Sequence, residues 1–271
     1  MRARERLFRV RVAGHRWARW VQDALSPEPW AETRGDPADF PVEVAVRTSP
    51  LQRAPTGAIA AYTQEKTHNL RLAAAGVTGL VVGPGEVFSF CRTVGATTAR
   101  TGYLPALELH DGAMQPSVGG GLCQLSNLLL LLALDTGAEI LERHRHSFDL
   151  FRDVERAVPF GCGATVFYNY VDFRFRNPLG APLLLQVEVA PPLLVGRVRA
   201  AAPLPFAAAL VETDHRFFRD AGTIYRANRV WRETIWRDGR EPARELLFEN
   251  CCRVLYPADD LVSGTDKEDI P

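Results

Sequence analysis

The chain has 271 residues, of which 46% are hydrophobic and 24% charged, with 32 basic and 32 acidic side chains. These values are typical of a soluble globular protein with one good-sized core, or a core and a small second lobe, and they exclude a wholly disordered, fibrous or membrane-embedded chain. The balanced charge provides no strong positive field, so we expect no nucleic-acid partner.

The first twenty residues differ from the rest, because they hold seven arginines and one glutamate, with Trp17 and Trp20 near their end. We interpret them as a solvated basic strand or helix, and the alternative is contact with an anionic membrane surface. They contain no apolar core of a signal peptide, which predicts a cytoplasmic protein. Residues 1–50 carry five prolines and lack sustained periodicity, so they are predicted to form a basic, irregular N-terminal arm.

A helix is predicted from Thr63 to Ala75, where apolar and polar residues fall at helical spacing and Gly76 is placed to end the helix. Gly83-Pro84-Gly85 marks a turn. The residues that follow, Glu86 to Phe90, predict a short strand.

The most informative segment begins with three consecutive glycines, Gly119, Gly120 and Gly121, and continues into an apolar run. Glycines followed by such a run predict a loop that leads into a buried helix, which we expect to end near Gly137. The run is far shorter than the roughly 20 residues that a membrane span needs. Ala138 to Arg143 then predicts a strand.

Further strands are predicted in the second half of the chain. Aromatic and polar residues alternate from Ala164 to Phe175, and a turn at Asn177–Gly180 predicts a hairpin with Pro182–Val189. Gly222 to Pro257 predicts two or three more strands, with a turn at Asp238-Gly239.

These elements predict an α+β protein, in which a buried helix headed by a cysteine packs on an antiparallel sheet and a smaller β-rich piece follows. The predicted division is an N-terminal arm at 1–50, a core domain at 51–200, a β-rich C-terminal extension at 201–257 and an acidic mobile tail at 258–271.

Cys123 is the candidate nucleophile. Five cysteines, an odd number without an export signal, predict reduced thiols rather than a disulfide framework. A thiol at the first turn of a helix meets the positive end of the helix dipole, which favours the thiolate. The glycines would let a substrate approach, and the Cys123 N–H with the Gln124 side chain could bind a developing oxyanion.

Two imidazoles and an acid follow Cys123. His144 and His146 share a face if they lie on a strand, and Asp172 in the next strong strand could orient one of them. The order of cysteine, helix, strand with histidine and strand with aspartate is also that of papain-like and transglutaminase-like enzymes. This order predicts a core of that kind by analogy of architecture.

Each of these residues also has a structural interpretation. Cys123 could be packed in the core, since cysteine is among the most buried residue types. His144 and His146 could be strand-end residues beside Glu142 and Arg143, and Asp172 could form a cross-strand ion pair with a neighbouring arginine.

A zinc site is a further alternative, with ligands drawn from Cys123, His144, His146 and Asp172. The sequence lacks the usual ligand spacings of zinc sites, so we predict no metal. It also lacks phosphate-loop, dinucleotide-binding and serine-hydrolase motifs, so no cofactor is predicted.

The sequence as a whole resembles the VanW family over roughly residues 65–190. One consistent order of motifs carries the resemblance: Val82–Phe90 (VGPGEVFSF), Val94-Gly95, Gly102-Tyr103, Ala106, GGGLCQLS at 119–126, Glu142-Arg143, His146-Ser147, Pro159-Phe160-Gly161, Ala164-Thr165-Val166, Asp172, Phe175 and Asn177. Many members carry an aspartate before the Ala-Thr pair, where this chain has Cys162-Gly163. The short length resembles the stand-alone members from B-type vancomycin resistance clusters. The resemblance implies a link to cell-wall or glycopeptide-resistance biology, without supplying a reaction.

Two hypotheses for function follow. The first is a cysteine-dependent amide hydrolase or acyltransferase with Cys123 as nucleophile, His146 as base and Asp172 as orienter. The second is a non-catalytic module that binds a peptide or a peptidoglycan precursor in the same place. The residues expected to line the site in either case are Gly119, Gly120, Gly121, Gln124, Ser126, Glu142, Arg143 and His144.

Overall fold

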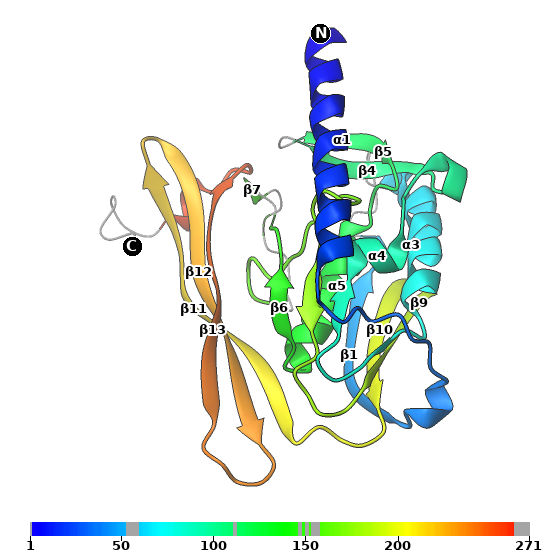
Figure 1. Ribbon diagram of the computed structural model, residues 1–271. Helices are drawn as coiled ribbons and strands as arrows, with labels where there is room; N and C mark the ends of the chain where they lie inside the picture. The colour runs from blue at the N-terminus through cyan, green and yellow to red at the C-terminus, as the bar shows by residue number, and fades with distance from the viewer. Residues whose placement is uncertain are drawn as a thin grey trace.

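The computed structural model describes residues 2–52, 60–110, 113–145, 148–149, 152 and 158–262. His146 and the end of the predicted acidic tail, 263–271, lie outside these residues. The architecture is α+β, as predicted, and is built from antiparallel sheets with few helices (Figure 1).

The core is a four-stranded antiparallel sheet covered by two helices. Its strand order is β1 (Val42–Pro50), β10 (Leu193–Ala200), β9 (Leu183–Ala190) and β2 (Val81–Val82). The helices α3 (Thr63–Val77) and α5 (Cys123–Asp135) contact this sheet and each other.

Helix α5 is the buried centre of the molecule, and it begins at Cys123 as predicted. Its residues 128–134 are all buried, because a helix that is apolar all round must be enclosed by protein. Gly196 of β10 lies directly against Leu128 and Leu132, and the absence of a side chain there lets helix and sheet approach closely. The helix ends at Asp135, and Gly137 follows with a φ of 74°.

Smaller elements surround this core. A three-stranded sheet has the order β3 (Val87–Ser89), β8 (Arg174–Arg176) and β6 (Glu139–Glu142), and it encloses Phe88, Phe173 and Phe175. The remaining short elements are η1 (Pro37–Asp39), α4 (Phe90–Val94), η2 (Ala99–Thr101), η3 (Asp259–Leu261) and the hairpin of β4 (Pro105–His110) and β5 (Ala113–Val118).

The C-terminal part forms a separate sheet of long strands at one side of the molecule (Figure 1). It consists of β11 (Phe206–Asp220), β12 (Thr223–Trp236), β13 (Ala243–Val254) and the short parallel strand β7 (Phe148–Asp149). The β-rich character and the turn at Gly239 match the prediction, while β11 adds a strand before the predicted range.

The prediction of an irregular arm at residues 1–50 is wrong. Arg2–Leu25 form a long helix, α1, and Val42–Pro50 form β1, an edge strand of the core sheet. The periodicity of this region was missed because α1 binds the body through charged side chains and β1 is largely exposed on one face. The boundaries between the predicted domains stay predictions.

Three further predictions differ from the structure. The segment from Ala164 to Phe175 contains a turn around Asn169, whose φ is 50°, and regular strand structure begins at Arg174. The strand β9 pairs with β10 and β2 rather than with β8, so the predicted hairpin is not formed. The helix α3 also runs past Gly76 to Val77. Turn residues correctly marked where strands begin, but they do not determine which strands pair.

The prediction of unpaired cysteines agrees with the structure. All five cysteines are unpaired. Across the described ranges, no helix is both long enough and apolar enough to cross a bilayer.

Candidate functional site

The three glycines before α5 form a tight turn against the protein's own backbone. Gly119 and Gly121 have φ values of 81° and 89°, which few other residues adopt without strain. A Cβ on Gly120 would lie 2.0 Å from the carbonyl oxygen of Ala106 on β4. The turn therefore brings the start of α5 close to the β4–β5 hairpin, and what approaches these glycines is protein.

A cavity of about 400 Å³ lies beside the start of α5. Cys123 is partly buried and lines it, together with Glu108 of β4. Hydroxyl and aromatic side chains complete the wall, notably Thr97, Thr98, Ser117, Phe167 and Tyr168. The cavity is of the size that small-ligand sites commonly have, and it combines an acidic group, hydroxyls and rings.

The thiol of Cys123 is not activated in this structure. Burial raises its pKa to about 11, and the charge of Glu108 acts in the same direction, while the backbone N–H of Val166 acts against it. This is opposite to the direction predicted from the helix terminus. Removal from water outweighs the helix dipole here, because a thiolate loses its solvation when it is buried.

Cys91 is a second thiol at the same cavity, which sequence reasoning missed. It lies on the short helix α4 and accepts a hydrogen bond from the N–H of Asn169 at 3.3 Å. Burial raises its pKa above the usual range of a thiol, and the carboxylate of Asp172 adds to the shift. Both thiols at the cavity are therefore protonated near neutral pH.

Gln124 and Ser126 face away from the cavity. The Gln124 amide donates to Ser49 Oγ and to the carbonyl of Pro50, both at 2.8 Å, which turns it towards β1. Ser126 is fully buried and donates to the carbonyl of Ala164 at 2.5 Å. Both side chains join α5 to neighbouring segments, and neither lines the cavity.

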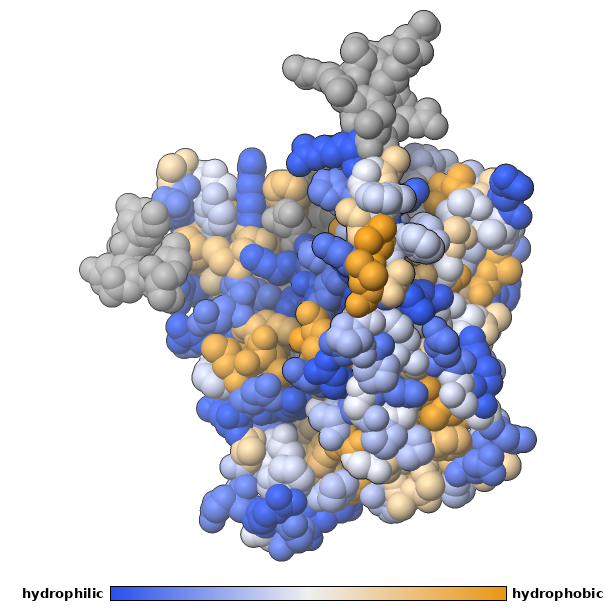
Figure 2. Space-filling model, viewed as in Figure 1, coloured by the Kyte–Doolittle hydropathy of each residue, from blue (hydrophilic) through white to orange (hydrophobic). Residues whose placement is uncertain are grey.

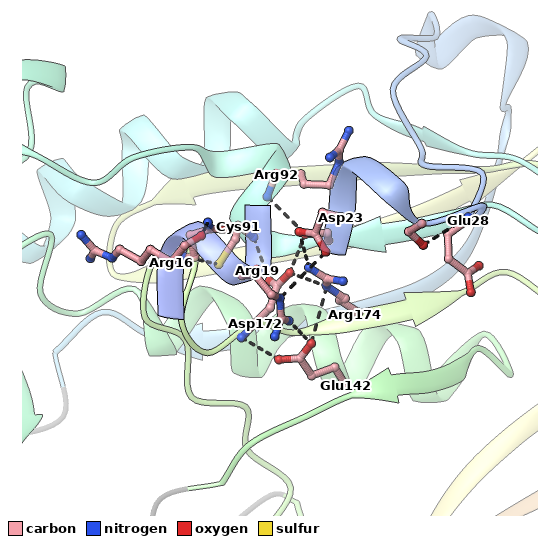
Figure 3. Close-up of polar contacts among 12 residues, drawn as sticks. Arg16, Arg19, Asp23, Glu28, Cys91, Arg92, Glu142, Asp172 and Arg174 are labelled. Atoms are coloured by element: carbon pink, nitrogen blue, oxygen red, sulfur yellow. Dashed lines mark hydrogen bonds and ion pairs between the residues drawn. The ribbon is translucent and has the colours of Figure 1, made fainter. Parts of the chain in front are cut away.

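Asp172 belongs to a buried ionic cluster between α1, β6 and β8 (Figure 3). Its carboxylate is 1% exposed and accepts hydrogen bonds from Ser89 Oγ at 2.5 Å and from Arg174 Nε at 2.7 Å. The backbone N–H groups of Cys91 and Phe173 donate to it at 2.8 and 2.9 Å. These donors hold the carboxylate in place, and none of them is an imidazole.

The same cluster contains Glu142 and His144. Glu142 accepts from the backbone N–H of Asp172 at 3.0 Å and from the guanidinium of Arg19 on α1. His144 is half-exposed, and its Nε2 lies 3.1 Å from Glu142. Arg174 completes the cluster by donating to Asp23 of α1 at 2.7 Å. The structure therefore brings His144 and Asp172 to Glu142, and it does not bring them to the cavity of Cys123.

Arg143 faces the C-terminal sheet. It donates to the carbonyls of Gly161 at 2.6 Å and Gly163 at 2.9 Å, and its guanidinium lies 3.6 Å from the ring centre of Phe248. Burial lowers its pKa to about 10. This arginine joins the core to β13.

Comparisons with known proteins agree with the sequence motifs. A model of the VanW-like protein family matches residues 65–199. The vancomycin B-type resistance protein VanW of Enterococcus faecalis is 30% identical over 208 residues, which cover 76% of each chain. This chain belongs to the VanW family. No solved structure matches, so a papain-like or transglutaminase-like core stays a prediction.

This chain is also similar to the uncharacterized protein YoaR of Bacillus subtilis. It is 34% identical over 128 residues, which cover 46% of this chain and 40% of that protein. The VanW match runs from α3 to β10 and so includes every wall of the Cys123 cavity except Arg16 of α1. The cavity is thus built mainly from the part of the chain that defines the family.

Among the residues that the structure describes, no three His, Cys, Asp or Glu side chains are grouped so that they could hold a zinc ion. His146 lies outside those residues, so its predicted role as base stays a prediction.

Proposed function

We propose that this VanW-family chain is a non-catalytic binding protein of cell-wall biology, which takes a peptide of the peptidoglycan-precursor type into the Cys123 cavity. The cavity carries the proposal, because it combines a carboxylate, a guanidinium, several hydroxyls and three aromatic rings around a thiol with a raised pKa. The name of the Enterococcus relative supports a role in glycopeptide resistance.

Glu108 gives the proposed ligand its chemistry. Arg16 of α1 also lines the cavity, so its wall carries charges of both signs and favours a ligand with an ammonium and a carboxylate group, since charge-assisted hydrogen bonds contribute more than neutral ones. The hydroxyls of Thr97 and Ser117 would bind amide groups of a peptide, and Phe167 would cover its apolar part. A short peptide with free termini has all of these features.

Binding of a soluble peptidoglycan stem pentapeptide to the full chain, measured by titration calorimetry, tests this function. We expect Glu108→Gln to weaken binding by about tenfold or more, because a hydrogen bond to a charged group contributes about 1.5–3 kcal/mol. Glu188→Gln is the matched control, since Glu188 lies on β9 outside the cavity and is 64% exposed. Equal weakening by both variants, or no binding by the parent chain, would contradict the proposal.

A cysteine hydrolase or acyltransferase is the second candidate, with Cys123 as nucleophile, His146 as base and Asp172 as orienter. The observation that favours it is the place of Cys123, which is the first residue of α5 and lines the cavity. This candidate needs His146 to reach the thiol and lower its pKa.

The pH dependence of alkylation at Cys123 separates the two candidates. Only the thiolate form of Cys123 reacts, and below the pKa this form is a small fraction of the total. The rate of alkylation should therefore stay low at pH 8 and increase as the pH approaches about 11. Mass spectrometry of the Cys123 peptide measures this rate in the parent, His144→Ala and His146→Ala chains, and we expect three similar profiles. A rate that increases through a pKa well below about 8.5 and is lost in His146→Ala would establish the enzyme instead.

A further inference from the structure

The helix α1 carries strongly exposed apolar side chains. Among the large apolar side chains of the described residues, the three with the greatest exposure are Leu25 at 79%, Trp17 at 69% and Trp20 at 65%. All three belong to this one helix. Tryptophan is seldom left exposed without a partner, because its ring buries a large apolar area on contact.

The two sides of α1 differ in character. Arg16, Arg19 and Asp23 fall at helical spacing and bind the body through Tyr168, Glu142 and Arg174. Ala13, Trp17, Trp20 and Ala24 are spaced by four, three and four residues, which places them along another face of the helix. All four are exposed, and two of them, Trp20 and Ala24, also border a cavity between α1 and the body.

The helix also extends beyond the body and is strongly basic. Its N-terminal part projects past the hairpin of β4 and β5 (Figure 1), and Figure 2 shows a small hydrophobic patch among hydrophilic residues where α1 crosses this face. The first twenty residues of the sequence contain seven arginines and one glutamate. Basic charge and exposed indole rings therefore occur on the same element.

We propose that α1 binds parallel to a membrane surface rich in anionic lipids, with Trp17 and Trp20 among the lipid headgroups. Indole rings favour the membrane–water interface, because they are apolar with one polar N–H group. Arginines near such a surface are attracted to anionic headgroups, and the two signals together give stable attachment where one alone is weak. The helix lies on the surface, since no helix in the described ranges can cross a bilayer.

A lipid surface fits this helix better than a protein groove does. An apolar groove contacts mainly the apolar face of a helix, whereas this helix carries arginines as well as exposed indole rings. A layer of anionic headgroups accommodates both the indole rings and the arginines. This inference is independent of the ligand proposed for the Cys123 cavity.

Flotation of the full chain with phosphatidylcholine vesicles and with vesicles that also contain phosphatidylglycerol tests the inference. We expect binding to the anionic vesicles, little binding to the neutral ones, and a decrease as salt screens the charges. The double variant Trp17→Ala/Trp20→Ala should weaken binding by about tenfold or more, as the loss of two interfacial side chains predicts. Ile235→Ala is the control, because Ile235 is 55% exposed on β12, outside α1.

Circular dichroism checks that each variant folds like the parent. We expect normal folding, because the substituted side chains are exposed. Equal binding to both kinds of vesicle would overturn the inference, as would equal binding by the double variant and the parent. Light scattering adds a third outcome: self-association lost in the double variant, without vesicle binding, would assign the face to a second copy and also overturn it.

Discussion

At the scale of single residues, Asp172 shows how a carboxylate that suggests catalysis can instead hold segments together. Its ion pair with Arg174 at 2.7 Å is a structural contact, but the two residues lie two positions apart on one segment, so the predicted cross-strand pair is not what forms. Its bond to Ser89 links positions 83 residues apart, and no local pattern predicts such a contact. Because Ser89 also caps α4, Asp172 fixes the start of the helix that carries Cys91.

Asp172→Asn tests this structural role. The substitution keeps the shape of the side chain but replaces an acceptor oxygen with an NH2 group that faces buried donors, while Arg174 keeps its pair with Asp23, so the free energy of unfolding should decrease by about 1–3 kcal/mol. Urea denaturation measures the change. Asp259→Asn is the control: Asp259 pairs with Arg219 at a site where it is 76% exposed, and its loss should change stability by less than about 0.5 kcal/mol. Similar shifts in both variants would contradict the structural role.

The chemistry of Cys123 was harder to predict than its position. The sequence correctly places it at the start of a buried helix, because glycines followed by a leucine run form a strong local pattern. Its pKa depends on burial and on Glu108, which lies on a hairpin that the sequence analysis did not anticipate. The cavity was missed for the same reason, since its walls come from segments that meet only in the folded chain.

At the scale of elements, prediction succeeded where the hydrophobic pattern agrees with burial. Helix α5 and strand β6 lie close to their predicted ranges. The aromatic residues of 164–171 look like a strand, yet they line a turn and the cavity, because large half-buried rings also suit a loop packed on a core. Strand pairing depends on contacts between distant segments and was predicted wrongly for β9.

Gly120→Ala tests the close contact between the glycine turn and β4. The new Cβ would overlap the Ala106 carbonyl oxygen, so the backbone must move and stability should decrease by about 1–3 kcal/mol. Gly180→Ala is the matched control, since no atom lies within 4 Å of its added Cβ. Thermal unfolding of the two variants measures the difference in stability. If Gly120→Ala were as stable as the parent, the turn would tolerate separation from β4.

At the scale of the whole molecule, the core and the C-terminal sheet share an apolar contact. Leu131 of α5 packs with Cys162 and Val230, and Val230 of β12 is fully buried. Arg143 strengthens the connection through Phe248 of β13. These contacts predict that the two parts unfold as one cooperative unit, although the sequence suggests separate domains.

Leu131→Ala tests this cooperativity. The cavity it leaves should cost about 2–5 kcal/mol, and native-state hydrogen exchange should show the same decrease in protection for α5 and for β12. Leu246→Ala on β13 is the control, because Leu246 is 41% exposed. A decrease confined to α5 would mean that the C-terminal sheet unfolds independently.

The position of β1 determines where the family's segment can be cut. The VanW match runs over residues 65–199, but β1 at Val42–Pro50 covers one side of β10, the strand in which that segment ends. A fragment limited to the match would leave the backbone N–H and carbonyl groups of β10 unpaired along that edge, next to Leu194 and Val198 of the core. An uncovered apolar edge of this kind recruits strands from other molecules. Such a fragment would therefore aggregate, and the smallest soluble unit of this protein extends at least to Val42.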